Sequence, residues 1–114
     1  FFVVNPLHDG MNLVSKEFVA SRTDERGVLI LSRFTGAWRE LEEALGINPY
    51  ALDETAEAIH TALTMDEAEQ TRRMRRMRHQ ITTNNIYRWA GKILSTLLNF
   101  DLPDYDATAE AALD

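Results

Sequence analysis

Two short apolar runs on either side of an amphipathic segment constrain the fold of this chain more than any other feature. "FFVV" (1–4) and "GVLILS" (27–32) are rich in β-branched residues and are bounded by turn residues. Continuous apolar runs of this kind are typical of parallel strands buried on both faces of a sheet. The segment between them, 11–22, has the periodicity of a helix. Its predicted inward residues are Leu13, Val14 and Phe18. Strand, helix and strand over about 30 residues predict a βαβ unit.

The rest of the chain is predicted to be mostly helical. Helices are expected at 35–45, at 53–65, through the arginine-rich segment that follows, and from about residue 84 to 99. A short third strand is expected within 46–50. The predicted class is α/β, a partial Rossmann-like fold with about three parallel strands, flanking helices and C-terminal helices.

A doubly wound sheet usually has five or six parallel strands, and this chain offers about three. We therefore expect part of a larger α/β domain over residues 1–100. Residues 101–114, "DLPDYDATAEAALD", carry five acids and no base and are expected to form an acidic tail or linker.

Composition excludes several classes of protein. Hydrophobic residues make up 45% and charged residues 26% of the chain, as in soluble globular proteins. No apolar run approaches the roughly 20 residues of a membrane-spanning helix. The absence of cysteine excludes disulfides, Cys-ligated zinc and thiol catalysis, and it fits a cytoplasmic location.

The arginine-rich segment "RRMRRMR" (72–78) raises the question of nucleic-acid binding. The net charge of −6 argues against it, because a nucleic-acid-binding domain is expected to be net basic. Met74 and Met77 fall at helical spacing and are predicted to face the core. The arginines are then a solvated face that pairs with nearby acids, and no nucleic-acid partner is expected.

The loop "NPLHDGMNLV" is the segment where ligand chemistry is expected. In open α/β sheets, ligands bind outside the carboxyl ends of the strands. Gly10 permits close approach of a backbone or ligand, and the free N–H groups near Met11 to Val14 would form an anion site at a helix start. Asp9 is either a helix cap or an acceptor for a sugar hydroxyl. Glu17, one turn on, is either a solvated residue or a ligand for a diol such as a ribose.

The longer string "PLHDGMNLVSKEFVA" resembles the donor-site signature of the trehalose-6-phosphate synthase family of retaining glycosyltransferases, PLRDGMNLV followed by Lys-Glu. Further matches follow in order: "GVLILSRFTGAWREL", "INPYALDETAEAIHTALTM" and "NNIYRWAGKIL" are similar to the next segments of that family. The resemblance implies the GT-B architecture of two Rossmann-like domains facing across a cleft. This chain would be the C-terminal part of the donor-binding domain.

The resemblance also implies roles for individual residues. Asp9 and the Gly10–Met11–Asn12 segment would hold hydroxyls of the donor glucose. The backbone N–H groups of Leu13 and Val14 would hold the diphosphate, and Glu17 would hold the ribose hydroxyls. No metal and no cofactor is expected. No residue is assigned a catalytic role, and this chain alone is not expected to be catalytically competent.

The implied activity is transfer of glucose from a nucleoside-diphosphate glucose, with UDP-glucose favoured, to glucose 6-phosphate with retention of configuration. Glucosylglycerol-phosphate synthesis and a non-catalytic regulatory role are the alternatives. Three residues depart from the family pattern: His8 stands for Arg, Arg33 for Glu, and Trp38 for a small residue. The apolar stripe of the last helix also makes self-association an expectation.

Overall fold

The secondary structure runs from a parallel sheet to a series of helices. A computed structural model describes residues 1–84 and 86–99. In chain order the elements are β1 (Phe2–Val4), α1 (Leu13–Ser21), β2 (Leu29–Ser32), the 3-10 helix η1 (Gly36–Arg39), β3 (Leu45–Ile47), α2 (Leu52–Thr64), α3 (Glu67–Thr83) and α4 (Ile86–Leu98). The chain divides into one unit over Phe1–Thr83 and another that begins at Asn84.

The sheet has the strand order β1-β2-β3, and both pairings are parallel. Val4 lies opposite Leu31, and Ser32 lies opposite Ile47. The predicted α/β class with three parallel strands is confirmed. The third strand begins at Leu45, one residue before the predicted segment.

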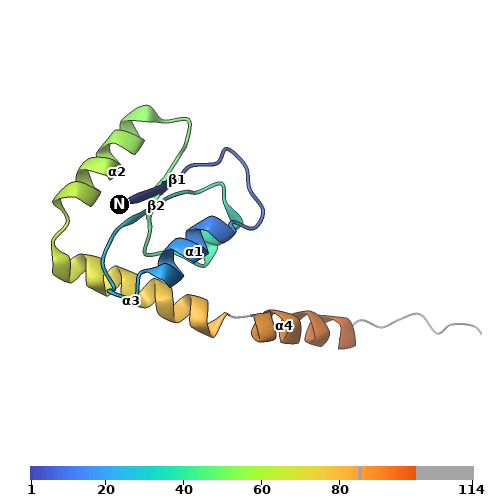
Figure 1. Cartoon of the computed structure of the whole chain (residues 1–114). Coiled ribbons are helices and arrows are strands. Elements are labelled where there is room, and N and C mark those ends of the chain that lie inside the picture. Colours follow the sequence, from blue (N-terminus) through green and yellow to red (C-terminus); the bar gives the residue numbers. More distant parts are fainter. Residues whose placement is uncertain (85, 100–114) are drawn as a thin grey trace, which may run out of the picture. The chain divides into compact units, whose positions relative to one another are not determined.

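Helices cover both faces of the sheet within the first unit (Figure 1). α1 and α3 contact each other on one face, and α2 packs on β2 and β3 at the other. Because side chains alternate along a strand, β2 supplies both cores. The core on the α1 and α3 side includes Val19, Leu29, Leu31, Met74 and Met77. The core under α2 is formed by Val28, Ile30, Ile47 and Ala62.

Burial of β1 on both faces is a wrong prediction for this chain. β2 is fully buried, whereas Phe2 and Val3 of β1 are 37% and 38% exposed. β1 is an edge strand here, paired only with β2 in the described sheet. Phe2 stacks on Phe18 of α1 with ring centroids 4.7 Å apart, which covers one of its faces.

The inward face of α1 also differs from the prediction. The helix begins at Leu13 rather than residue 11, and its buried residues are Ser15 and Val19. Leu13 and Val14 are 57% and 51% exposed. The prediction that Leu13 and Val14 face inward, which followed from their apolar character, is therefore wrong.

The helix predicted over 35–45 is shortened to the 3-10 turn η1. β3 already begins at Leu45, so the chain must return to the sheet within a few residues. It does so through tight turns, in which Leu41 N–H donates to Ala37 O (2.9 Å) and Ala44 N–H donates to Leu41 O (3.0 Å). Leu41 and Ala44 are buried in the α1 and α3 core.

The structural role predicted for the arginine-rich segment is confirmed. Met74 and Met77 are 0% and 1% exposed. Four arginines of α3 form ion pairs with acids, and Arg78 donates to backbone carbonyl oxygens of α1 instead. The acidic partners of the four arginines are Glu25, Glu43 and Glu69. The expectation that α3 is a core helix with a charge-paired outer face therefore holds.

α4 is amphipathic and forms its own unit. Leu94, Leu97 and Leu98 are each more than half exposed. Across the described part of the chain, every helix is too short or too polar to cross a membrane. The predicted acidic tail, 101–114, lies outside the described residues, and the domain boundary at residue 100 stays a prediction.

Candidate functional site

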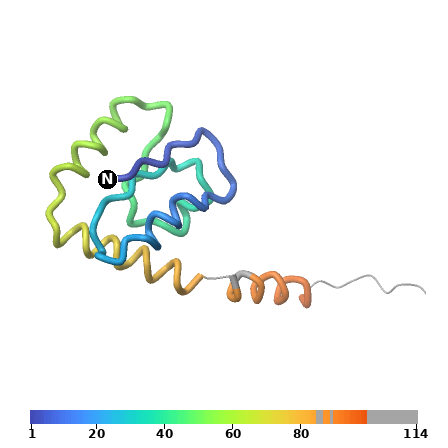
Figure 2. The backbone as a smooth tube through the Cα atoms, viewed as in Figure 1, coloured from blue at the N-terminus to red at the C-terminus, as the bar shows by residue number. Residues whose placement is uncertain are grey.

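The loops that follow β1 and β2 meet at one edge of the sheet. In Figure 2 the chain after β1 and the chain after β2 lie side by side there. Asp9 and Thr35 form an isolated parallel bridge, and the Gly36 N–H donates to the Asp9 carbonyl oxygen over 3.0 Å. The two loops therefore extend the β1–β2 pairing beyond the end of the strands.

Asp9 contacts the start of α1 through Asn12. The Asn12 amide nitrogen donates to the Asp9 carboxylate over 2.8 Å. The Asn12 side-chain oxygen accepts from the Ser15 N–H over 2.7 Å and is the N-cap of α1. Of the two roles predicted for Asp9, helix cap or sugar ligand, the structure rules out the cap. Asn12 caps the helix, and Asp9 accepts a hydrogen bond from Asn12.

The first turn of α1 presents backbone donors to solvent. The first N–H groups of a helix have no partner within the helix. Asn12 satisfies the N–H of Ser15, which leaves those of Leu13 and Val14 at the exposed end of α1. The positive end of the helix dipole adds to these donors, so this helix start suits an anion.

The remaining predicted residues lie just before α1 and on the helix itself. Met11 is 61% exposed, just before the cap. Glu17 is exposed on α1, four residues after Leu13 and thus on the same helix face. Six of the seven predicted donor residues, 9–14, therefore lie in the loop before α1 and at its start, and Glu17 lies at the middle of the helix.

The glycine that close packing requires is Gly36, rather than Gly10. A Cβ added at Gly10 would meet no atom within 4 Å. A Cβ at Gly36 would overlap the Gly10 carbonyl oxygen and lie 3.1 Å from the carbonyl carbon. The two peptide segments can therefore touch only because residue 36 has no side chain.

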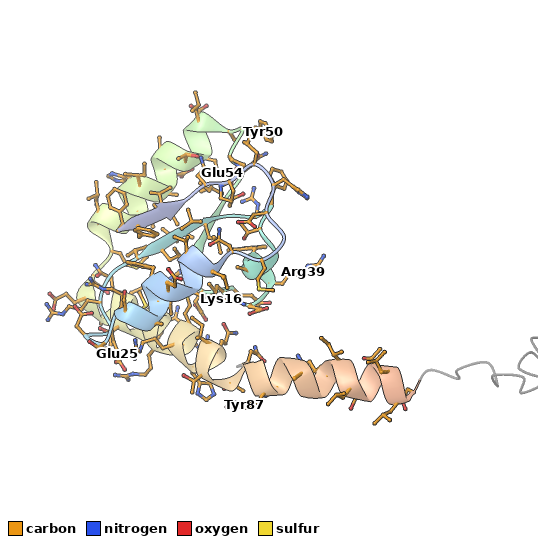
Figure 3. The ribbon with its side chains drawn as sticks, turned by 45° about the vertical axis from the view of Figure 1, so that its right-hand side comes forward. Lys16, Glu25, Arg39, Tyr50, Glu54 and Tyr87 are labelled. Carbon is orange, nitrogen blue, oxygen red and sulfur yellow. The ribbon has the colours of Figure 1, made fainter. Side chains whose placement is uncertain are left out.

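A concavity of about 390 Å³ opens beside these loops. It is lined by His8, Asp9, Gly10, Arg33, Phe34, Thr35, Gly36, Trp38 and Arg39. Three of these residues, His8, Arg33 and Arg39, carry basic side chains and are exposed. Figure 3 shows Arg39 at this end of the sheet and Glu25 at the opposite end.

Arg33 is already engaged in the structure. It donates to the Gly46 carbonyl oxygen over 3.1 Å and pairs with Glu54 of α2. The hydrogen bond from Arg33 is the main cause that holds the pKa of the Glu54 carboxyl below its ordinary value. Arg39 and His8 are therefore the more available basic groups at this rim.

A larger concavity, of about 530 Å³, lies between α3 and the segment after η1. Its arginines already have acidic partners, because Arg75 pairs with Glu25 and Arg76 with Glu43. The smaller concavity is lined by Asp9 and Gly10 of the loop that leads into α1, so it is the stronger candidate site. Among the described residues, no three His, Asp or Glu side chains are grouped so that they could hold a metal ion.

Sequence reasoning missed the contribution of the second loop. The sequence predicts a helix over 35–45 that contains Thr35 and Gly36, and it indicates no role for Arg39. The available signal was the position of "FTGAWR" directly after the second apolar run. The carboxyl ends of neighbouring parallel strands lie at one edge, so the loop after β2 is expected beside the loop after β1. Trp38 packs partly buried against the α1 and α3 core, as expected of a packing residue, and also lines the concavity.

Comparison with known proteins identifies relatives over most of the chain. The sequence profile of glycosyltransferase family 20 matches residues 1–99. A bifunctional trehalose-6-phosphate synthase/phosphatase of Thermoproteus tenax is 52% identical over 97 residues, which are 85% of this chain and 13% of that protein. The trehalose-6-phosphate synthase of Mycobacterium leprae is 45% identical over 106 residues, 93% of this chain and 21% of that protein.

Solved structures similar to this chain include proteins with the same or a related name. An alpha,alpha-trehalose-phosphate synthase (UDP-forming) of Burkholderia xenovorans, in complex with glucose-6-phosphate, superposes with a TM-score of 0.78 at 46% identity. The match covers 85% of this chain and 22% of that chain. The N-terminal domain of a Candida albicans trehalose-6-phosphate phosphatase gives a TM-score of 0.79 at 27% identity, over 88% of this chain and 21% of that chain.

The chain thus spans about a fifth or less of the length of these relatives. The match nevertheless includes the loop after β1, the helix start and the loop after β2, which together form the candidate site. On the extent of the profile match, which covers residues 1–99, the chain belongs to glycosyltransferase family 20.

Proposed function

We propose that this chain is part of the donor-binding domain of a retaining glucosyltransferase that makes trehalose 6-phosphate from UDP-glucose and glucose 6-phosphate. The observation that carries the proposal is the exposed start of α1. There the Leu13 and Val14 N–H groups lie beside the Asp9–Asn12 pair, within a family whose relatives are named as synthases. The relative from Burkholderia xenovorans is named UDP-forming and was solved with glucose-6-phosphate, which favours this donor and this acceptor.

In this mechanism the site acts by electrostatic stabilisation. Cleavage of the bond between glucose and the diphosphate leaves negative charge on the departing diphosphate. Oriented N–H groups at Leu13 and Val14, with the helix dipole behind them, stabilise that charge as it develops. The exposed Arg39 and His8 lie at the rim of the same concavity and add positive potential when charged.

The sugar hydroxyls are the expected partners of the acidic groups. The Asp9 carboxylate is partly exposed and uses one oxygen for Asn12, so its other oxygen is available to accept from a glucose hydroxyl. Glu17 lies about one turn along the same face of α1, where its carboxylate suits the diol of a ribose.

A non-catalytic role is the second candidate. The similarity to the N-terminal domain of a trehalose-6-phosphate phosphatase shows that this fold is not confined to proteins named as synthases. His8 stands where the family signature has arginine, so the bidentate guanidinium expected at this position is absent. A glucosylglycerol-phosphate synthase is a third candidate, which differs in acceptor.

Donor binding separates these candidates. Calorimetry on the full-length protein is expected to show binding of UDP-glucose, with ADP-glucose and GDP-glucose as comparisons. Turnover with glucose 6-phosphate against glycerol 3-phosphate then distinguishes the two synthases. If none of the three nucleotide sugars binds, the synthase proposal is wrong and the non-catalytic role is favoured.

Substitutions test the placement of the donor. Asp9→Ala and Glu17→Ala are each expected to weaken UDP-glucose binding by about 10- to 150-fold, the loss of one charge-assisted hydrogen bond of about 1.5–3 kcal/mol. Asp9→Asn should weaken binding less than Asp9→Ala, because it keeps an acceptor oxygen. Glu57→Ala, an exposed acid on α2, is the matched control and should bind as the wild type does. Unchanged affinity in both Asp9→Ala and Glu17→Ala would show that the donor binds elsewhere.

A further inference from the structure

Gly36 lies outside the segment that the donor is expected to touch, yet it contacts that segment directly. Its N–H donates to the Asp9 carbonyl oxygen over 3.0 Å. Its α-carbon faces the Gly10 carbonyl so closely that any side chain at residue 36 would overlap the oxygen. The position of the Asp9–Gly10 peptide therefore depends on the absence of a side chain at residue 36.

The segment around Gly36 is anchored, so it cannot easily yield. Thr35 is 4% exposed, and its hydroxyl donates to the Ser32 carbonyl oxygen over 3.0 Å. The Trp38 N–H donates back to the Thr35 hydroxyl oxygen over 3.2 Å. Ala37 is 2% exposed and belongs to the core. A side chain at residue 36 must therefore displace the Asp9–Gly10 loop rather than the end of β2.

Displacement of that loop is transmitted to α1. The Asp9 carboxylate holds the Asn12 amide, and the Asn12 oxygen caps the Ser15 N–H. Asn12 is 6% exposed and Ser15 is 0% exposed, so the cap is packed as well as hydrogen-bonded. A shift of Asp9 thus misplaces both the carboxylate and the helix donors at Leu13 and Val14.

We infer that Gly36 is a positioning residue for the donor site: its backbone fixes the Asp9–Gly10 peptide and, through Asn12, the exposed N-terminus of α1. This inference rests on the proposed function for its effect on the donor. Its structural part, the control of the loop by residue 36, stands on the contacts alone. Gly10, by contrast, has open space at its α-carbon, so no contact within the chain requires glycine at this position.

The first test measures donor affinity in the full-length protein. Gly36→Ala is expected to weaken UDP-glucose and UDP by about 10- to 100-fold, the scale of a misplacement of about 1 Å in a binding site. UDP is affected as well as UDP-glucose because the helix donors for the diphosphate move with the loop. Gly91→Ala on α4 is the matched control, since a Cβ there meets no atom within 4 Å, and it should leave both affinities unchanged.

A second control separates positioning from general loss of stability. Ala62→Gly removes a core methyl group on the other face of the sheet, where Ala62 of α2 is 5% exposed and packs with Val28, Ile30 and Ile47, and it lowers the melting temperature. Measured well below the melting temperatures of both variants, its donor affinity should stay within about twofold of the wild type, as for distant independent sites. Wild-type affinity in Gly36→Ala, or an equal loss in Ala62→Gly, overturns the inference.

Amide hydrogen exchange tests the structural part without a donor. In Gly36→Ala, exchange at residue 36 and at Ser15 should be at least about tenfold faster, since both hydrogen bonds are expected to weaken. Unchanged exchange at both amides overturns the inference. If the wild type binds no UDP-glucose, the proposed function fails, while this exchange result still decides the role of Gly36.

A wild-type measurement covers the case in which Gly36→Ala does not fold. Binding of UDP-glucose is expected to slow exchange of the Gly36 and Ser15 amides, because a donor held by the loop also stabilises the contacts behind it. Exchange at Gly36 that is equally fast with and without saturating UDP-glucose contradicts the coupling.

Discussion

At the scale of single residues, Asn12 connects the loop after β1 to the helix that follows. Its amide donates to Asp9, its side-chain oxygen caps Ser15, and its carbonyl oxygen accepts from the Ser15 hydroxyl over 3.1 Å. Asparagine is among the preferred N-cap residues because its short side chain reaches the N–H groups of the first turn. A single amide thereby holds both the acidic group and the helix donors of the proposed site.

Loss of this cap should lower stability. Asn12→Ala is expected to reduce the free energy of unfolding by about 1 kcal/mol, within the range of about 0.5–2 kcal/mol for lost helix caps. Urea unfolding followed by circular dichroism measures it. Asn12→Ser is the control, because serine keeps a capping oxygen but cannot reach Asp9 with an amide. If Asn12→Ala and the wild type unfold at the same urea concentration, the cap does not contribute to stability.

At the scale of the elements, α3 is held to the rest of its unit by charged groups around its buried methionines. Arg72 and Arg73 both bond to Glu69 on their own helix, with distances of 2.8 Å. Arg78 donates to the carbonyl oxygens of Val19 and Ala20 at the end of α1. The arginine-rich segment thus satisfies free carbonyl groups and acids within the chain.

Acid titration should reveal the pairing on α3. Hydrogen bonds from Arg72 and then Arg73 lower the pKa of Glu69 from its ordinary value of 4.5 to about 2. The folded state binds this proton less readily than the unfolded state, so the stabilisation is complete above about pH 4.5 and is lost as the pH falls toward 2. Glu69→Gln should therefore be less stable than the wild type near neutral pH, and this difference should shrink between pH 4.5 and 2.

Thermal unfolding over that pH range measures the effect. Glu57→Gln, an exposed position on α2, is the matched control and should follow the wild type at every pH. Because Glu69 is at the surface, raised salt should also reduce the difference between Glu69→Gln and the wild type. A difference that stays constant from pH 7 to pH 2 would contradict the assigned ion pairs.

At the scale of the whole molecule, the described residues of α4 include a row of exposed apolar side chains. Its residues Ile93, Leu94, Leu97 and Leu98 are 40% to 84% exposed and lie at helical spacing. Exposed apolar stripes of this kind favour association with a partner surface. The self-association expected from the sequence stays a prediction.

Sedimentation velocity tests it on the chain as printed. The weight-average sedimentation coefficient is expected to rise with protein concentration, and Leu94→Glu should reduce that rise, because a charge in an apolar interface is desolvated without a partner. Ser95→Glu, on the neighbouring exposed position of α4, is the control and should associate as the wild type does. A concentration-independent coefficient for the wild type contradicts self-association.

The sequence by itself determined the fold class and the location of the candidate site. Continuous apolar runs rich in β-branched residues identified both strands, although only β2 is buried on both faces. The match of residues 9–14 and Glu17 to a family signature then predicts a donor site on the loop after β1, which stays a prediction. The sequence also predicted that Met74 and Met77 face the core, because apolar residues on the buried face of a helix recur every three to four positions.

The tertiary structure decided how that loop is held. Leu13 and Val14 are exposed, and Asn12 rather than Asp9 caps α1. The contact between Gly10 and Gly36 joins residues that are distant in sequence and adjacent in space, so no local pattern contains it. Local propensity specifies which segments are strands and helices, whereas the pairing of two loops depends on the parallel register of β1 and β2.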